Sequence, residues 1–137
     1  MRALATDSLG VTGSSPSTSI SVLGGTSGGL LGEYFNTRNL TGPRVVRMDP
    51  VIDFDWGNGA PMEAIQPDNF SVRWTGTITP RFRELYKFIA TVDDGFRLWV
   101  NNRMVINSWI DQAPTVHRGT ISLVAGRAVP IRMEFYE

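Results

Sequence analysis

The chain has 137 residues with thirteen basic and thirteen acidic side chains, so its formal net charge is zero. Twelve of the basic residues are arginines, and they are scattered along the chain rather than clustered. Nucleic-acid binding normally needs a basic patch or stripe, and no apolar run approaches the roughly 18 residues of a membrane span. The composition therefore predicts one domain with a core of its own, no nucleic-acid partner and no membrane insertion. Because the chain has no cysteine, no disulfide bond cross-links that core.

The first 28 residues differ in composition from the rest of the chain. Residues 12–19 and 24–29 are rich in Gly, Ser and Thr, which is typical of flexible linkers. The apolar island Ile20–Leu23 lies between them and is either part of a tail or a short strand, over residues 19–23, that pairs with another segment. The first residues lack the apolar core of a secretory signal, so export would need a signal that this chain does not contain. We expect a flexible N-terminal extension over 1–28 and a folded domain over 29–137.

The folded part shows short alternating runs of apolar and polar residues with turn signals between them, as in antiparallel β strands. Strands are predicted at residues 70–74, 85–92, 96–100, 103–106, 120–124 and 129–136. Asn101 and Asn102 predict a hairpin turn, because Asn tolerates the positive φ angles of a type I′ turn. Pro130 cannot donate to a ladder and is expected at a strand start, an edge or a bulge. Residues 36–69 hold many Gly and Pro signals and are predicted to be loops. The pattern indicates an all-β antiparallel sandwich or barrel.

An acidic doublet, Asp93 and Asp94, interrupts two of these predicted strands. Asp is depleted in strands and neighbouring like charges repel, so something must compensate for the pair. A bound cation, the backbone N–H groups of a tight turn, or open water would each do so. The residues alone leave these three explanations open.

Six motifs occur in an order and spacing that resemble the PA14 domain family over residues 29–137: Leu30-Leu-Gly-Glu-Tyr-Phe35, Asp53-Phe-Asp-Trp-Gly57, Phe70-Ser-Val-Arg-Trp-Thr-Gly76, Asp93-Asp-Gly-Phe-Arg-Leu-Trp-Val100, Ser108-Trp109 and Pro130-Ile-Arg-Met-Glu-Phe-Tyr-Glu137. The resemblance implies a β sandwich or barrel with a jelly-roll-like topology. It also implies use outside the cell or at the cell surface, as in adhesins, glycosidases and toxins. Such domains usually continue past the last motif to a further strand. The sheet is therefore expected either to lack its last strand or to receive it from another segment, such as residues 19–23.

The resemblance also implies a metal site. In adhesin members of the family, an Asp-Asp pair joined by a cis peptide bond holds Ca²⁺, and the ion in turn coordinates sugar hydroxyls. Asp93 and Asp94 occupy the matching motif position. Calcium takes six to eight oxygen ligands, so other groups must complete such a site. Asp111 and Gln112 are candidates for this role, and Trp109, which opens the same loop, is a candidate for contact with the sugar.

The remaining histidine and aspartate residues do not form a further metal or catalytic site in the sequence pattern. His117 is the only histidine, so it cannot build a multi-histidine metal site, and we expect it in a solvated loop. Asp53 and Asp55 do not continue as an EF-hand loop and are expected to fix their loop through Asx-type hydrogen bonds. Adjacent carboxylates cannot easily flank a scissile glycosidic bond from opposite sides, so the chain is not expected to be an enzyme.

Two functions follow. The first is a calcium-dependent carbohydrate-binding or adhesion module, extracellular or at the cell surface, whose partner is a glycan or cell-surface polysaccharide. The alternative is a structural or assembly module of a surface polymer or filament. It would bind copies of itself or neighbouring domains by strand complementation through the N-terminal extension, without binding a glycan.

Overall fold

The structure, a computed structural model, describes residues 2–6 and 28–137. This part of the chain forms nine strands and no helix, which confirms the all-β prediction. The strands are β1 (Arg2–Thr6), β2 (Leu30–Phe35), β3 (Arg44–Asp49), β4 (Ser71–Ile78), β5 (Glu84–Val92), β6 (Gly95–Val100), β7 (Arg103–Ser108), β8 (Thr115–Leu123) and β9 (Val129–Tyr136).

Within the described residues, no helix is long and apolar enough to cross a membrane.

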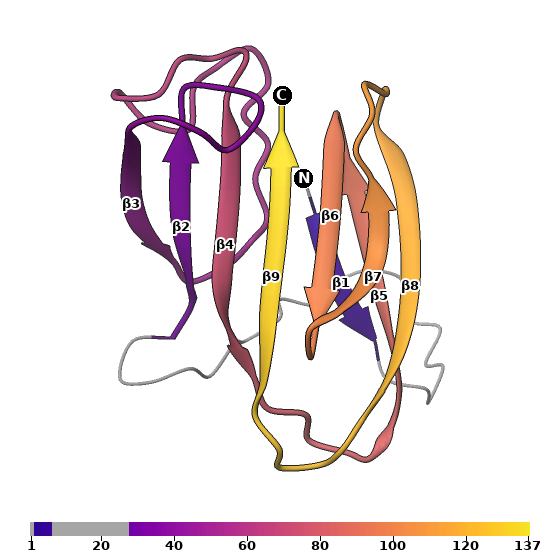
Figure 1. Cartoon of the computed structure of the whole chain (residues 1–137). Coiled ribbons are helices and arrows are strands. Elements are labelled where there is room, and N and C mark those ends of the chain that lie inside the picture. Colours follow the sequence, from indigo (N-terminus) through magenta and orange to yellow (C-terminus); the bar gives the residue numbers. More distant parts are fainter. Residues whose placement is uncertain (1, 7–27) are drawn as a thin grey trace.

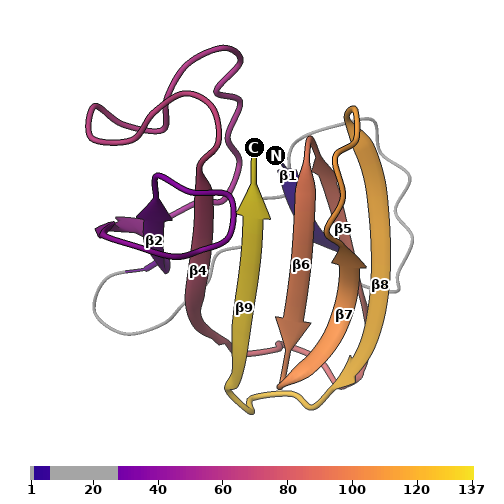
Figure 2. The ribbon, with the colours of Figure 1, turned by 45° about the horizontal axis from the view of Figure 1, so that its top comes forward.

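The strands form two antiparallel sheets that face one another (Figure 1). The larger sheet has the order β3-β2-β4-β9-β6-β7, and the smaller has the order β1-β5-β8. Figure 2 shows β5 behind β6, and β8 beside β7 at the side of the molecule, so the molecule is an open sandwich with its core between the layers. Strands distant in sequence pair in this arrangement; β4 and β6 both pair with β9, which lies at the centre of the larger sheet.

All six predicted strands are present, and three more were not predicted. β2 coincides with the first motif of the family resemblance, and β3 lies in the segment 36–69 that was predicted to be loops. β1 lies in the N-terminal extension. The predicted strand at residues 19–23 falls outside the described residues.

The structure confirms the predictions for the Asn101–Asn102 turn and Pro130 and contradicts the prediction for His117. Asn101 and Asn102 have φ angles of 50° and 61°, as the predicted hairpin turn requires. Pro130 is the second residue of β9. The prediction for His117 was wrong: β8 starts at Thr115 rather than near residue 120, so this histidine lies within a strand, opposite Ala90 of β5.

The core is built from side chains on the inner faces of both sheets. Alternation along β9 sends Ile131, Met133 and Phe135 inward, while the intervening residues point to the other face. Trp74 and Phe70 are fully buried beside them. Burial of these large aromatic side chains contributes much of the driving force for packing the two layers.

A buried carboxylate lies inside this core. Asp49, at the end of β3, is 3 % exposed and accepts hydrogen bonds from Tyr34 Oη at 2.5 Å and Trp74 Nε1 at 2.7 Å. Arg47 Nε donates to its other oxygen at 2.5 Å, and Arg47 Nη2 donates to Tyr34 Oη at 2.6 Å. Burial, reinforced by the Asp49 charge, raises the pKa of Tyr34 well above its ordinary value. Every oxygen of the buried carboxylate thus has a partner, as buried charge requires.

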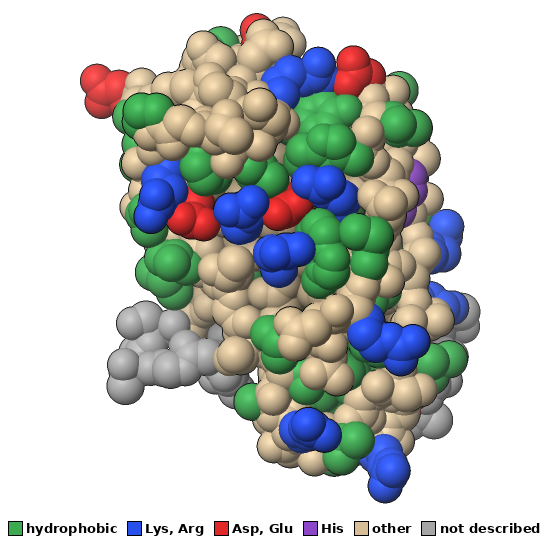
Figure 3. Space-filling model, in the orientation of Figure 1, with side chains coloured by type: hydrophobic (Ala, Val, Ile, Leu, Met, Phe, Trp, Pro, Cys, Tyr) green, Lys and Arg blue, Asp and Glu red, His purple; other side chains and the backbone are tan. Residues whose placement is uncertain are grey.

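The outer face of the larger sheet carries a row of alternating charges. Figure 3 shows basic and acidic side chains alternating across this face. Arg44 pairs with Glu33 at 2.6 Å, and the buried Glu134 accepts from Arg73 at 3.0 Å and pairs with Arg97 at 2.7 Å. Glu33, Arg73, Glu134 and Arg97 lie directly opposite one another on β2, β4, β9 and β6, and Arg44 of β3 lies diagonally from Glu33, so the row crosses the strands.

Candidate functional site

One end of the sandwich gathers the loops that carry the predicted site residues. The β2–β3 loop (residues 36–43), the turn between β5 and β6, and the β7–β8 loop (residues 109–114) all lie there, beside the C-terminal end of β9 (Figure 1). The acidic doublet forms the β5–β6 turn, and the peptide bond between Asp93 and Asp94 is cis. This peptide geometry is the one that the family resemblance implied.

The turn is held tightly against the end of β9. The Asp94 amide donates to the carbonyl of Tyr136 at 3.4 Å. The next residue, Gly95, lies directly under the Tyr136 ring, and a Cβ atom at this position would overlap that ring. The glycine of the Asp-Asp-Gly motif is therefore required by a close approach of side chain to backbone.

Gln112 of the β7–β8 loop braces Asp94. Its backbone amide donates to Asp94 Oδ1 at 2.9 Å, and its side-chain Nε2 donates to the Asp94 carbonyl at 2.7 Å. The side-chain oxygen of Gln112 faces away from the doublet, with Ser108 Oγ at 3.3 Å and His117 Nε2 at 3.1 Å. Two hydrogen bonds from Gln112 thus fix the loop to the turn, and Ser108 and His117 contact the side-chain oxygen of Gln112.

A guanidinium completes this side of the doublet. Arg38, from the β2–β3 loop, pairs with Asp111 and lies 3.7 Å from Asp94 Oδ2. Its guanidinium also stacks over the Tyr136 ring at 4.4 Å, and Tyr136 Oη donates to Asp111 at 2.7 Å. The hydrogen bonds from Tyr136 and Arg38 lower the pKa of Asp111, while burial and the bond to Asp111 raise the pKa of Tyr136 to about 12.

Trp109 packs on the same cluster and is only partly exposed. Its ring meets the edge of Tyr136 with centroids 4.6 Å apart, and the Arg97 guanidinium stacks on it at 3.9 Å. Four of the five predicted residues (Asp94, Trp109, Asp111 and Gln112) therefore converge around Arg38 and Tyr136.

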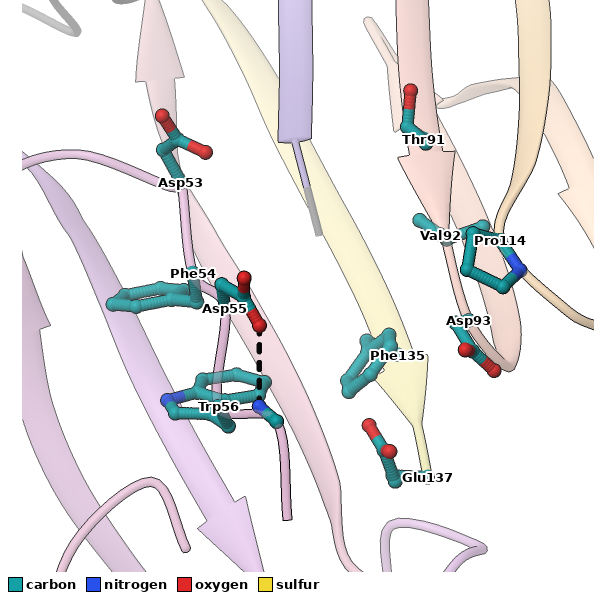
Figure 4. Close-up of a pocket in the computed structure, with 11 residues that line it drawn as sticks. Asp53, Phe54, Asp55, Trp56, Thr91, Val92, Asp93, Pro114, Phe135 and Glu137 are labelled. Atoms are coloured by element: carbon teal, nitrogen blue, oxygen red, sulfur yellow. Dashed lines mark hydrogen bonds between the residues drawn. The ribbon is translucent and has the colours of Figure 1, made fainter. Parts of the chain in front are cut away.

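Asp93 lines a second feature at this end of the sandwich, a pocket (Figure 4). The cavity has a volume of about 650 Å³ and lies between the β3–β4 loop and the ends of β5 and β9. Asp55 and Glu137 contribute further carboxylates to its lining, and Trp56 and Phe135 contribute aromatic surface. Among the residues that the structure describes, no basic side chain lines it.

The two aspartates of the β3–β4 loop lie across this pocket from Asp93. Asp55 Oδ1 accepts from the Gly57 amide at 3.2 Å, which confirms the Asx-type bond predicted for this residue. Phe54 and Trp56 stack with centroids 4.9 Å apart, and Trp56 packs on Phe70 and Phe135 of the core. The wall opposite Asp93 is therefore anchored to the sandwich by aromatic packing.

Glu137 is a partly buried carboxyl group at this acidic pocket. Burial, together with the charges of Asp93 and Asp94, raises the pKa of Glu137 to about 7. Its backbone amide donates to the Phe70 carbonyl at 3.0 Å, which holds the residue at the pocket. The pocket therefore has a negative potential that disfavours one more ionised carboxyl group and would favour a cation.

This pKa gives a pH-dependent stability with a definite sign. The folded-state pKa of about 7 exceeds the ordinary value of 4.5, so the protonated form is favoured in the folded state. The stabilising contribution is complete below about pH 4.5 and is lost as the pH rises to about 7. In urea unfolding, the wild type should lose stability relative to Glu137→Gln across this window. The exposed Glu63→Gln serves as the control, and parallel pH curves for wild type and Glu137→Gln would contradict the prediction.

Asp93 and Asp94 supply only part of the oxygen ligands that a calcium ion needs. In residues 2–6 and 28–137, no group of three or more His, Cys, Asp or Glu side chains is arranged to hold a metal ion. Asp93 and Asp94 supply hard oxygen atoms of the kind calcium prefers, but they are two carboxylates where six to eight oxygens are required. The doublet therefore fits calcium as part of a ligand set, which carbonyl groups, water or a bound glycan would have to complete.

Residues 26–137 match the PA14 domain family, and the chain belongs to this family. It is 47 % identical over 116 residues to the anti-sigma-I factor RsgI3 of Acetivibrio thermocellus, covering 85 % of this chain but only 18 % of that protein. A solved structure of an anti-sigma factor domain-containing protein superimposes with a TM-score of 0.77 at 47 % identity, covering 80 % of this chain and 38 % of that chain. The chain thus spans less than half the length of these relatives.

A more distant structure supports the fold. The PA14 domain of the MpAFP antifreeze protein superimposes with a TM-score of 0.63 over 92 % of this chain and 80 % of that chain, at 14 % identity. At this identity the likeness concerns the fold alone.

Sequence reasoning found the doublet but missed the groups that surround it. Arg38 comes from a segment distant in sequence, and no local pattern marks it. Tyr136 and Glu137 belong to the last motif of the resemblance, although the position of Tyr136 beside Gly95 and Asp111, and that of Glu137 at the pocket, become visible only in the fold.

Proposed function

We propose that this domain is a non-catalytic glycan-binding module that works outside the cell and uses a calcium ion held by Asp93 and Asp94. The observation that carries the proposal is the position of Asp93, which lines an acidic pocket with aromatic walls and is the direct neighbour of a second carboxylate, Asp94. When bound, calcium would offer coordination positions to sugar hydroxyls. The neighbouring groups suit such a ligand, because sugar-sized pockets combine apolar surface with a few placed polar groups.

The chain's own residues have distinct tasks in this proposal. Gln112 and the Tyr136 carbonyl fix the turn so that its carboxylates keep their orientation. Arg38 balances the negative charge on the Asp94 side, and Asp93 remains exposed to the pocket. The partly exposed Trp56 provides the apolar wall against which the ring of a sugar could pack.

The relatives suggest how binding is used. Both close relatives carry the name of anti-sigma factors, so we propose that the domain acts as the sensing part of a longer protein that reports a polysaccharide to the transcription machinery. Adhesion through the same site would need the same calcium-dependent contacts with a glycan, so a measurement of calcium and glycan binding tests both the sensing role and the adhesive role.

Calorimetric titration of the protein with Ca²⁺, after chelator treatment, tests the metal site directly. We expect wild-type protein to bind calcium, and Asp93→Asn and Asp94→Asn to weaken binding by more than tenfold. This expectation follows because losing groups outside the ligand shell already costs about 10–100-fold at metal sites. Glu63→Gln should bind like wild type. Wild-type protein that shows no calcium-dependent heat would overturn the proposal.

The glycan is tested separately. Wild-type protein should bind to immobilised polysaccharides in calcium and be released by chelator, and the two Asp→Asn variants should bind under neither condition. Glycan binding that persists in chelator would place the binding site elsewhere, even if calcium binds at the doublet.

A further inference from the structure

β1 is an unusual strand of the sandwich because of how it is connected. It pairs only at the edge of the smaller sheet, antiparallel to β5, with Arg2 opposite Thr91 and Thr6 opposite Lys87. Residues 7–29, which are 23 residues long, separate it from β2. Fully extended, a segment of this length reaches about 75–80 Å, more than the distance needed to enter a neighbouring molecule.

The acceptor for β1 exists without it. β5 is nine residues long and is held on its other side by β8 along its whole length, from Glu84 opposite Leu123 to Val92 opposite Thr115. Its Phe88, Ala90 and Val92 are buried in the core. If β1 left, β5 would become a long edge strand with unpaired N–H and C=O groups, which is a template for another strand of the same sequence.

We propose that the edge of β5 is a strand-exchange site, at which Arg2–Thr6 of a second copy of this chain replaces β1 of the same copy. The exchanged strand makes the same backbone ladder as in the monomer, so the swap changes no contact within the sheet. The balance between the two forms is set by the effective concentration of the strand that is joined to its own domain, compared with the concentration of other copies. Crowded copies would exchange strands, and dilute copies would keep their own. The inference does not depend on glycan or calcium binding.

Because the chain has no cysteine, strand exchange can be tested by disulfide cross-linking between two introduced cysteines. Leu4 lies opposite Ile89 in the β1–β5 ladder, so cysteines at these two positions are close enough for a disulfide when the strands pair. One chain carries Leu4→Cys with a small tag, and the other carries Ile89→Cys without it. After mixing at high concentration and mild oxidation, a mixed disulfide between tagged and untagged chains reports exchange.

A matched control comes from the same strand. Leu85 lies on β5 on the same face as Ile89, but opposite Ser122 and outside the segment paired with β1, and it is more than half exposed. We expect the Leu4→Cys and Ile89→Cys mixture to give roughly tenfold more mixed disulfide than Leu4→Cys with Leu85→Cys, because only the first pair meets the geometric requirement. Dilution before oxidation should remove the difference.

The double variant Leu4→Cys/Ile89→Cys, oxidised at low concentration, should form the disulfide within one chain. If it does so while the mixture gives no excess over the control, exchange does not occur and the proposal fails. If the double variant forms no internal disulfide, the β1–β5 pairing itself is refuted, and the proposal with it.

Discussion

Asp49→Ala is expected to lower the free energy of unfolding by about 3–5 kcal/mol, the usual range when one partner of a buried ion pair is removed. The substitution leaves Tyr34 Oη and Trp74 Nε1 without their acceptor and removes the partner of Arg47 Nε. Each of these groups lost water on folding, so each contributes a desolvation cost that nothing then offsets. Urea unfolding followed by tryptophan fluorescence measures the change.

Asp49→Asn separates charge from shape. The amide oxygen can still accept from Tyr34 and Trp74, but its NH₂ group would face the Arg47 donor. We expect a loss smaller than for alanine and larger than for the exposed Glu63→Gln, which should stay within about 0.5 kcal/mol of wild type. Equal stability of Asp49→Ala and wild type would mean that the cluster contributes nothing net.

Glu134→Ala is the second large effect, with an expected loss of about 3–5 kcal/mol. The Glu134 carboxylate is 3 % exposed and is the common partner of Arg73 and Arg97, with Arg132 Nε at 3.8 Å. Its removal leaves three arginines close together on one face with no anion between them. Their mutual repulsion adds to the lost hydrogen bonds, so raised salt should recover part of the loss by screening the exposed portions.

The same row offers a matched control. Glu33 pairs with Arg44, whose side chain is 54 % exposed, and exposed pairs contribute about 0–1 kcal/mol. Glu33→Ala should therefore cost far less than Glu134→Ala, although both remove a glutamate from one ladder. Similar losses for the two variants would show that burial does not set the value of these pairs.

The sequence predicted the fold well where strands alternate cleanly. β5 and β9 send every second residue to the core, and this period-2 pattern is visible without tertiary information. β2 was missed as a strand because its residue types do not alternate between apolar and polar, although Leu30, Gly32 and Tyr34 are buried on one face. β1, Arg-Ala-Leu-Ala-Thr, has no strong β preference, and its extended form depends on pairing with β5.

The site was predictable only in part. Asp93 and Asp94 are neighbours in sequence, so a local motif could point to them. Arg38 meets Asp94 from 56 residues away, and Asp55 reaches the same pocket as Asp93 through loop packing. Contacts of this kind follow from which strands share a sheet, and single-sequence periodicity does not specify strand order.

The charge row on the larger sheet also restricts how its strands can align. A slip of two residues keeps every side chain on its own face, so the hydrophobic pattern alone does not oppose it. Arg132 lies two residues before Glu134 on β9 and shares its face. If β4 slipped by two residues along β9 in one direction, Arg73 would lie opposite Arg132 instead of Glu134. If β6 slipped in the same way on the other side of β9, Arg97 would lie opposite Arg132. The buried glutamate thus marks the one position at which both neighbouring strands find an opposite charge.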